Sequence, residues 1–205
     1  KNIHFNNFTL DYETPSAVTG KVVSCDTASK KIVIRINDEF DLTRPEYNGG
    51  KRVAGVGSYV EYYYNDLAGK LVPNPDGNLL YTRDITDASY DAESKCLTLT
   101  FSSIKETAPN TVVNVAFTMY DYFGIHMTDC KNLYIEQFDI YHTMGMSIGG
   151  SLCENVYFNG LRISPKPNTS RLMTATADGF HPYLFRGEIV VTNSIFEQSH
   201  DDSFN

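Results

Sequence analysis

Two short acidic motifs near the end of the chain hold residues that could carry out chemistry together. Residues 177–181 read ADGFH and residues 200–205 read HDDSFN, so Asp201 and Asp202 follow Asp178 by 23 and 24 residues. A fixed period of this size in a strand-rich solenoid stacks equivalent residues on adjacent coils, ~4.8 Å apart. We therefore expect the three carboxylates to form a cluster.

Such a cluster suits acid–base catalysis. Neighbouring carboxylates cannot all ionise without a cost, so one of them can hold a proton while another stays charged. Hydrolysis of a glycosidic bond needs one proton donor and one base; carboxyl groups ~6.5–9.5 Å apart predict inversion, and ~5–5.5 Å predicts retention. Counting one period pairs Asp178 with Asp201, whereas the apolar pattern pairs it with Asp202. Both pairings are open, and adjacent strand residues point to opposite faces, so the two differ in role or orientation.

A repeated strand pattern surrounds these motifs. Apolar residues recur at the second, fourth, seventh and ninth places of nine-residue segments, with Ser194 breaking the pattern once. Two alternating stretches joined by a bend put these side chains on one inner side, which is typical of a parallel β-helix coil. The segments are residues 2–10, 132–140, 155–163 and 188–196. The gap after residue 10 is far longer than one coil and predicts an insertion.

A second ladder leads into the acidic motifs. It reads Phe-Gly-Ile at 123–125, Met-Ser-Ile at 146–148, Asp-Gly-Phe at 178–180 and Asp-Ser-Phe at 202–204. One column thus changes from apolar to acidic twice in succession, which indicates a functional use of that column. The alternative is a pair of exposed turn aspartates, because Asp-Gly and Asp-Ser are common turn dipeptides.

The insertion reads as antiparallel β-structure. Alternating strands are expected at 20–26, 31–36, 58–64 and 95–101, and residues 26–34 are echoed by 91–99. Two similar hairpins favour a small barrel or sandwich. We expect residues 1–14 and 106–205 to form catalytic β-helix coils and residues 15–105 to form an inserted barrel-like domain. Strand packing is the favoured role of Tyr59, Tyr62, Tyr63 and Tyr64, with sugar contact as the alternative.

Composition narrows the class of protein. The chain has 205 residues, no Trp, 14 Tyr and 12 Phe, and lacks long helical periodicity, which favours an all-β fold. Its net charge of −8 argues against nucleic-acid or membrane partners. It opens within a strand pattern and ends on a motif, so we expect a fragment of a longer protein.

The cysteines and histidines predict no metal site and no cofactor. Cys130 and Cys153 are 23 residues apart, and we favour two stacked thiols over a disulfide. No Cys-x-x-Cys spacing supports structural zinc. His181 and His200 flank the aspartates and are the two histidines that we place in the site, as substrate-binding residues.

These motifs resemble one known family. The runs at 177–181, 186–191 (RGEIVV) and 200–202, with the opening at 8–15 (FTLDYETP) followed by Thr-Gly at 19–20, are similar to glycoside hydrolase family 110. Its members are bacterial α-1,3-galactosidases with a right-handed parallel β-helix and inserted β-barrels. The resemblance covers about 115 residues of predicted β-helix.

The resemblance implies specific roles. Asp178 is the expected general acid, and Asp201 and Asp202 are expected to hold the water and act as base. It implies an exo-acting inverting hydrolase that releases terminal α-1,3-linked galactose from blood-group B-type or linear α-galactosyl glycans. It also implies secretion or a periplasmic location.

Three alternatives use the same residues differently. The chain could be another inverting β-helix hydrolase, similar to a polygalacturonase, although the net acidic charge disfavours an acidic polymer. It could be a calcium-dependent lyase whose aspartates bind the metal. It could also be a non-catalytic glycan-binding β-helix.

Overall fold

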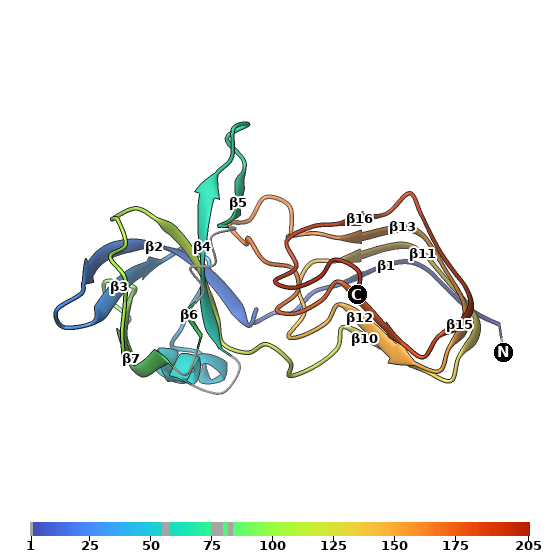
Figure 1. Ribbon diagram of the computed structural model, residues 1–205, viewed down its shortest axis with the longest axis horizontal. Helices are drawn as coiled ribbons and strands as arrows, with labels where there is room; N and C mark the ends of the chain where they lie inside the picture. The colour runs from blue at the N-terminus through green and yellow to red at the C-terminus, as the bar shows by residue number, and fades with distance from the viewer. Residues whose placement is uncertain (1, 55–57, 75–79, 82–83) are drawn as a thin grey trace. The chain divides into compact units, whose positions relative to one another are not determined.

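The protein is built almost entirely from β-strands, as the composition predicted. The computed structural model describes residues 2–54, 58–74, 80–81 and 84–205, and in that part the strands are joined by one 3-10 helix, η1 (Pro45–Ala54). The chain divides into two compact units. The parallel unit comprises residues 1–15, 120–169 and 173–205, and the antiparallel unit comprises residues 16–119 and 170–172 (Figure 1).

The predicted repeat forms the first parallel sheet. Its path is β1 (Ile3–Leu10), β11 (Lys131–Ile140), β13 (Glu154–Ile163) and β15 (Arg186–Thr192), and β16 (Ile195–Phe196) also pairs with β13. Ile3 pairs with Leu133, Leu133 with Val156, and Val156 with Ile189. These are the second places of the four predicted segments, so the alignment read from the sequence is confirmed. Figure 1 shows β1, β11 and β13 stacked side by side.

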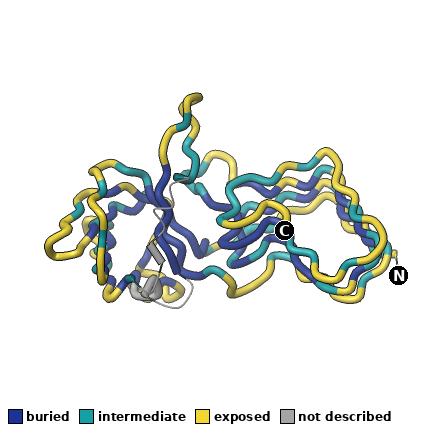
Figure 2. The backbone as a smooth tube through the Cα atoms, viewed as in Figure 1, coloured by how far each residue is buried: buried dark blue, intermediate teal, exposed yellow. Residues whose placement is uncertain are grey.

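A bend in mid-strand explains why the apolar positions are two, four, seven and nine. The residue between the two alternating stretches has positive φ in each segment: Asn7, Gln137, Gly160 and Asn193. A single left-handed residue shifts the alternation by one place, so all four apolar side chains face inward. Leu133, Ile135, Phe138 and Ile140 on β11 are accordingly buried, and Figure 2 shows buried residues along the stacked strands.

The corner before this sheet is held by an asparagine ladder. Asn132 Nδ2 donates to Asn2 Oδ1 and Asn155 Nδ2 donates to Asn132 Oδ1, both at 3.0 Å. The N–H of Glu188 then donates to Asn155 Oδ1 at 3.1 Å. At Gly187, φ is +69° and an added Cβ would collide with Asn155 Oδ1, so only glycine fits there.

The second parallel sheet positions the acidic motifs. It consists of β10 (Ile125–Thr128), β12 (Ile148–Ser151) and β14 (Phe180–Tyr183), with Ile125, Ile148 and Phe180 in register. Phe180 continues the row through a parallel bridge to Phe204. Ile148 and Phe180 are fully buried and pack in the same hydrophobic core as the first sheet. We call each level of stacked strands a rung.

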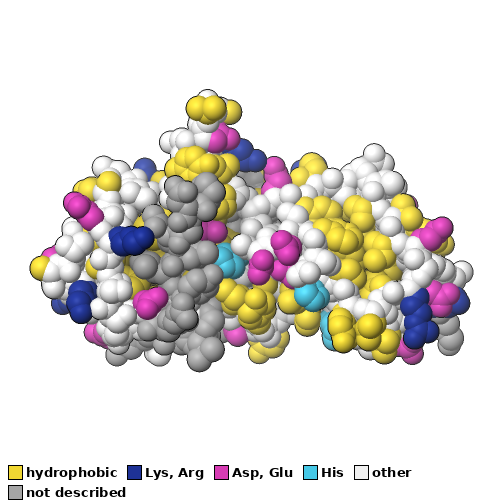
Figure 3. Space-filling view, in the orientation of Figure 1, with side chains coloured by type: hydrophobic (Ala, Val, Ile, Leu, Met, Phe, Trp, Pro, Cys, Tyr) yellow, Lys and Arg dark blue, Asp and Glu magenta, His cyan; other side chains and the backbone are white. Residues whose placement is uncertain are grey.

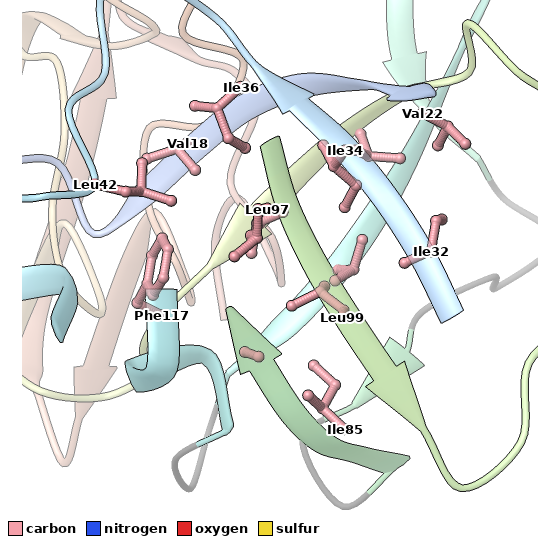
Figure 4. Close-up of a cluster of buried hydrophobic side chains, with 14 of the residues drawn as sticks. Val18, Val22, Ile32, Ile34, Ile36, Leu42, Ile85, Leu97, Leu99 and Phe117 are labelled. Atoms are coloured by element: carbon pink, nitrogen blue, oxygen red, sulfur yellow. The ribbon is translucent and has the colours of Figure 1, made fainter. Parts of the chain in front are cut away.

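The antiparallel unit is one eight-stranded sheet. Its path is β5 (Leu71–Pro73), β4 (Tyr59–Asn65), β9 (Val112–Ala116), β2 (Ala17–Asp26), β3 (Lys31–Ile36), β8 (Cys96–Phe101) and β7 (Ile85–Asp91), and β6 (Leu80–Tyr81) pairs with β4. The unit extends past residue 105 because β9 pairs with both β2 and β4. Its core includes Ile34, Leu97 and Leu99, all fully buried (Figure 4).

The two echoed hairpins fold alike. In the β2–β3 turn, Asp26 accepts hydrogen bonds from the N–H of Ala28 and the hydroxyl of Ser29. In the β7–β8 turn, Asp91 accepts the equivalent bonds from Glu93 and Ser94. Lys30 and Lys95 close the two turns with φ of 58° and 54°. The predicted strands and the internal echo are therefore confirmed.

All four cysteines are free thiols, in line with the favoured sequence interpretation. Cys130 and Cys153 stand on adjacent rungs, where the N–H of Glu154 donates to the carbonyl of Cys130 at 2.8 Å. Burial raises the pKa of the Cys153 thiol, which therefore stays protonated at neutral pH.

Candidate active site

Backbone hydrogen bonds set Asp178 beside Asp202. The N–H of Gly179 donates to the carbonyl of Asp202 at 2.9 Å, and the N–H of Phe180 donates to the carbonyl of Ser203 at 3.2 Å. The parallel bridges on either side, Ala175 with Ser199 and Phe180 with Phe204, both have an offset of 24 residues. Of the two pairings left open by the sequence, the structure has the one that the apolar pattern indicated.

The same ladder continues away from the acids. The N–H of Ser147 donates to the carbonyl of Asp178 at 2.9 Å, and the N–H of Gly124 donates to the carbonyl of Met146 at 3.0 Å. Phe123, Met146, Asp178 and Asp202 therefore occupy one column on four consecutive rungs. This is the column that changes from apolar to acidic in the sequence.

Asp178 is the buried member of the acidic cluster. Only 3% of the residue is exposed. Its Oδ2 lies 2.5 Å from His181 Nδ1 and accepts a hydrogen bond from Asn205 Nδ2 at 3.2 Å. A buried carboxyl group held by two partners has a fixed direction, which is what proton transfer to a bound substrate requires.

Asp201 and Asp202 lie at the surface instead. Both residues are exposed. The N–H of Asp202 donates to Asp201 Oδ1 at 3.1 Å, and the N–H of Asp201 lies 3.4 Å from the carbonyl of Ala177. The site thus combines one enclosed carboxyl group with two exposed ones.

Glycine at 179 allows the two acidic rungs to approach. A Cβ on Gly179 would lie 2.6 Å from the carbonyl oxygen of Ser203 and 3.2 Å from Ser199 Oγ. The first distance is below any normal contact, so a larger residue would force the Asp178 and Asp202 rungs apart. The Asp-Gly motif therefore serves this close approach in addition to any turn propensity.

The two predicted histidines differ from each other in their contacts. His181 lies against Asp178 as described, one residue beyond Phe180 on β14. His200 is half-buried, and its N–H donates to the carbonyl of Ala175 at 3.0 Å. His200 thereby helps to attach the Asp201–Asp202 turn to the preceding rung.

Asn205 is a site residue that the sequence analysis missed. Its N–H donates to the carbonyl of Phe180 at 3.0 Å, which sets it beside His181 on the next rung. The sequence did contain a signal for Asn205. Extending the aligned segments 178–180 and 202–204 by one residue pairs His181 with Asn205. Both side chains then reach the same oxygen of Asp178.

One face of the parallel unit exposes side chains of several kinds. Figure 3 shows acidic and histidine side chains next to hydrophobic side chains within the parallel unit. Among the residues that the structure describes, no three His, Cys, Asp or Glu side chains form a group that could hold a metal ion. In the same part of the chain, no helix is long and apolar enough to cross a membrane.

Comparison with known proteins gives a consistent result. Alpha-1,3-galactosidase B of Bacteroides thetaiotaomicron is 26% identical over 215 aligned residues, which cover the whole of this chain and 34% of that protein. The chain resembles α-1,3-galactosidases over its full length. Alpha-1,3-galactosidase A of Bacteroides fragilis is 20% identical over 99% of the chain and 33% of its own length.

A shorter match is more similar. Alpha-1,3-galactosidase A of Akkermansia muciniphila is 34% identical over 88 residues, or 43% of this chain and 15% of that protein. No family model matches the chain. These similarities confirm the resemblance predicted from the motifs. The chain spans about a third of the length of the α-1,3-galactosidases that match it throughout.

Proposed function

We propose that this chain carries the acid–base centre of an exo-acting, inverting glycosidase that releases terminal α-1,3-linked galactose from blood-group B-type or linear α-galactosyl glycans. The observation that carries the proposal is the pairing of a buried Asp178 with an exposed Asp202 on adjacent rungs. The similarity to α-1,3-galactosidases supports galactose as the released sugar and the α-1,3 linkage.

Asp178 is the proposed general acid. In this role it donates its proton to the glycosidic oxygen as the bond from that oxygen to the anomeric carbon breaks, and the leaving sugar departs with a new hydroxyl group. The contact with His181 Nδ1 can be made with the proton on either partner, so the pair can hold one proton and return it after each turnover. Asn205 fixes the carboxyl group from the next rung.

Asp201 and Asp202 are the proposed water-holding groups and base. A water molecule held by these exposed carboxylates loses a proton to one of them while its oxygen bonds to the anomeric carbon on the face opposite the leaving group. The attack converts the α-linked galactose into β-galactose. Asp201 and Asp202 are exposed, whereas Asp178 is enclosed, so the two proposed roles fall on groups in different surroundings.

The proposal extends to the fold and the location. We assign the parallel unit to coils of a right-handed β-helix and the antiparallel unit to an inserted barrel. The barrel consists of residues 15–105 together with strand β9. The chain is proposed to act without a metal or another cofactor, to contact a glycan and neither nucleic acid nor membrane, and to be secreted or periplasmic. His181 and His200 complete the proposed substrate-binding set.

The first experiment tests the intact protein against a neutral disaccharide and an acidic polymer. We expect release of galactose from galactose-α-1,3-galactose in the presence of a metal chelator, and no release of uronic acid from polygalacturonate. Activity confined to polygalacturonate, or loss of activity with the chelator, would replace the proposal by the polygalacturonase-like or calcium-dependent alternative. Binding of the disaccharide with no turnover would favour a glycan-binding role.

A further inference from the structure

An exposed aromatic patch lies on the rungs before the acidic cluster. Tyr120, Tyr122 and Phe123 are 60%, 66% and 39% exposed. With Gly145 and Met146 they line a pocket of about 110 Å³ in the parallel unit. The patch is attached to the site ladder, because the N–H groups of Asp121 and Tyr122 donate to the carbonyl of Met144 at 2.9 and 3.1 Å.

The Phe123 ring is held over the neighbouring rung. It stacks on His126 with ring centres 4.7 Å apart and an interplanar angle of 11°. It also covers Gly149, where any added Cβ would collide with the ring. The absence of a side chain at 149 therefore makes room for the Phe123 ring.

This position brings the ring next to the proposed acid. His126 pairs with Gly149, and Gly149 pairs with His181, so the three stand on consecutive rungs. The ring over Gly149 is thus about one strand spacing, ~4.8 Å, from the rung of His181. His181 in turn contacts Asp178.

The order of Phe123, Met146, Asp178 and Asp202 along their column determines which sugar of the substrate would contact the Phe123 ring. Along the column, Asp178 lies between Met146 and Asp202, and Phe123 lies beyond Met146. In an inverting reaction the acid stands on the leaving-group side of the anomeric carbon and the base stands on the opposite side. With Asp178 as acid and Asp201 or Asp202 as base, the aromatic patch lies on the leaving-group side.

We propose that Phe123, with Tyr122 at its edge, binds the leaving-group sugar, a neutral pyranose that stacks its C–H face on the exposed ring. This assignment rests on the proposed function. The Phe123 side chain is 39% exposed and its ring is held by His126 and Gly149, so it loses little conformational freedom when it binds, which favours such a role.

The test compares two substrates that share the same galactose. Galactose-α-1,3-galactose has a sugar as its leaving group, whereas α-galactosyl fluoride loses only a fluoride ion. In the intact protein we expect Phe123→Ala to lower kcat/KM for the disaccharide by about tenfold, the order of magnitude of one aromatic contact. The same variant should leave kcat/KM for the fluoride within about twofold.

Three further variants keep the test interpretable. Phe123→Tyr retains the ring and should restore the disaccharide rate, while Phe123→Leu retains bulk and should not. Tyr134→Ala removes a ring that is 39% exposed on β11, in the other parallel sheet, and should alter neither rate.

Three results would overturn the assignment. Equal losses on both substrates, or no loss on either, would show that Phe123 does not bind the leaving sugar. Failure of the unaltered protein to turn over either substrate would refute the proposed function itself and the assignment with it.

Discussion

Replacing Asp178 by Asn gives the most informative perturbation of the proposed mechanism. Asn has nearly the same shape, and its carbonyl oxygen can still accept hydrogen bonds from Asn205 and His181. The residue is 3% exposed, but this isosteric change leaves no cavity, and we expect the free energy of unfolding to change by about 1–2 kcal/mol at most. What the variant loses is the transferable proton.

The size of the rate loss follows from that role. General acid–base catalysis supplies ~10²–10⁴-fold, so kcat for galactose-α-1,3-galactose should fall by that factor, equivalent to about 3–5 kcal/mol in the barrier. Fluoride leaves without protonation, so hydrolysis of α-galactosyl fluoride should fall far less. Steady-state kinetics on both substrates with the intact protein measures the difference.

A matched control separates charge from catalysis. Asp139→Asn removes one carboxylate from β11, where Asp139 lies 3.8 Å from Arg162 in an exposed ion pair, and should leave both rates unchanged. If Asp178→Asn slowed both substrates equally, Asp178 would act in binding or folding and not as the acid. An unchanged rate on both would remove it from the mechanism altogether.

Three other predictions follow from single contacts. Asn205→Ala removes one of the two partners of Asp178 Oδ2, so kcat for the disaccharide should fall by about three- to tenfold with KM little changed, which steady-state kinetics will show. Gly179→Ala places a Cβ against the carbonyl of the adjoining rung and should destabilise the fold by about 1–3 kcal/mol in denaturant titrations; an unchanged midpoint would contradict the close approach. Burial and the neighbouring Glu61 raise the pKa of Tyr63 well above 10, so its contribution to stability is complete below about pH 10 and is lost as the pH rises beyond that value. Thermal melts from pH 8 to 12 should therefore show a flatter alkaline decline for Tyr63→Phe than for the unaltered protein.

The strand pairing was predictable because it depends on short patterns that repeat. Ile3, Leu133, Val156 and Ile189 are in register because each occupies the same apolar place in its own segment. A rung that slipped by one residue would turn its apolar side chains outward. The same reasoning aligned Asp178 with Asp202, which simple counting did not.

The features that were missed depend on side-chain direction or on distant partners. The N–H of Asn205 could be placed by the ladder, but its contact with Asp178 depends on how two side chains turn. Gly149 has no pattern of its own, and its importance appears only when the Phe123 ring is seen above it. Strand β9 lay outside the predicted insert because its partners, β2 and β4, are far away in sequence.

The configuration of the first product tests the central claim most directly. Galactose-α-1,3-galactose should be incubated with the intact protein inside a proton NMR spectrometer, and the anomeric signals followed before mutarotation equilibrates them. Acid and base on opposite sides of the anomeric carbon predict that β-galactose appears first and α-galactose only later. Initial release of α-galactose would contradict the assignment of Asp178 and Asp201 or Asp202 as the acid and base of an inverting hydrolase.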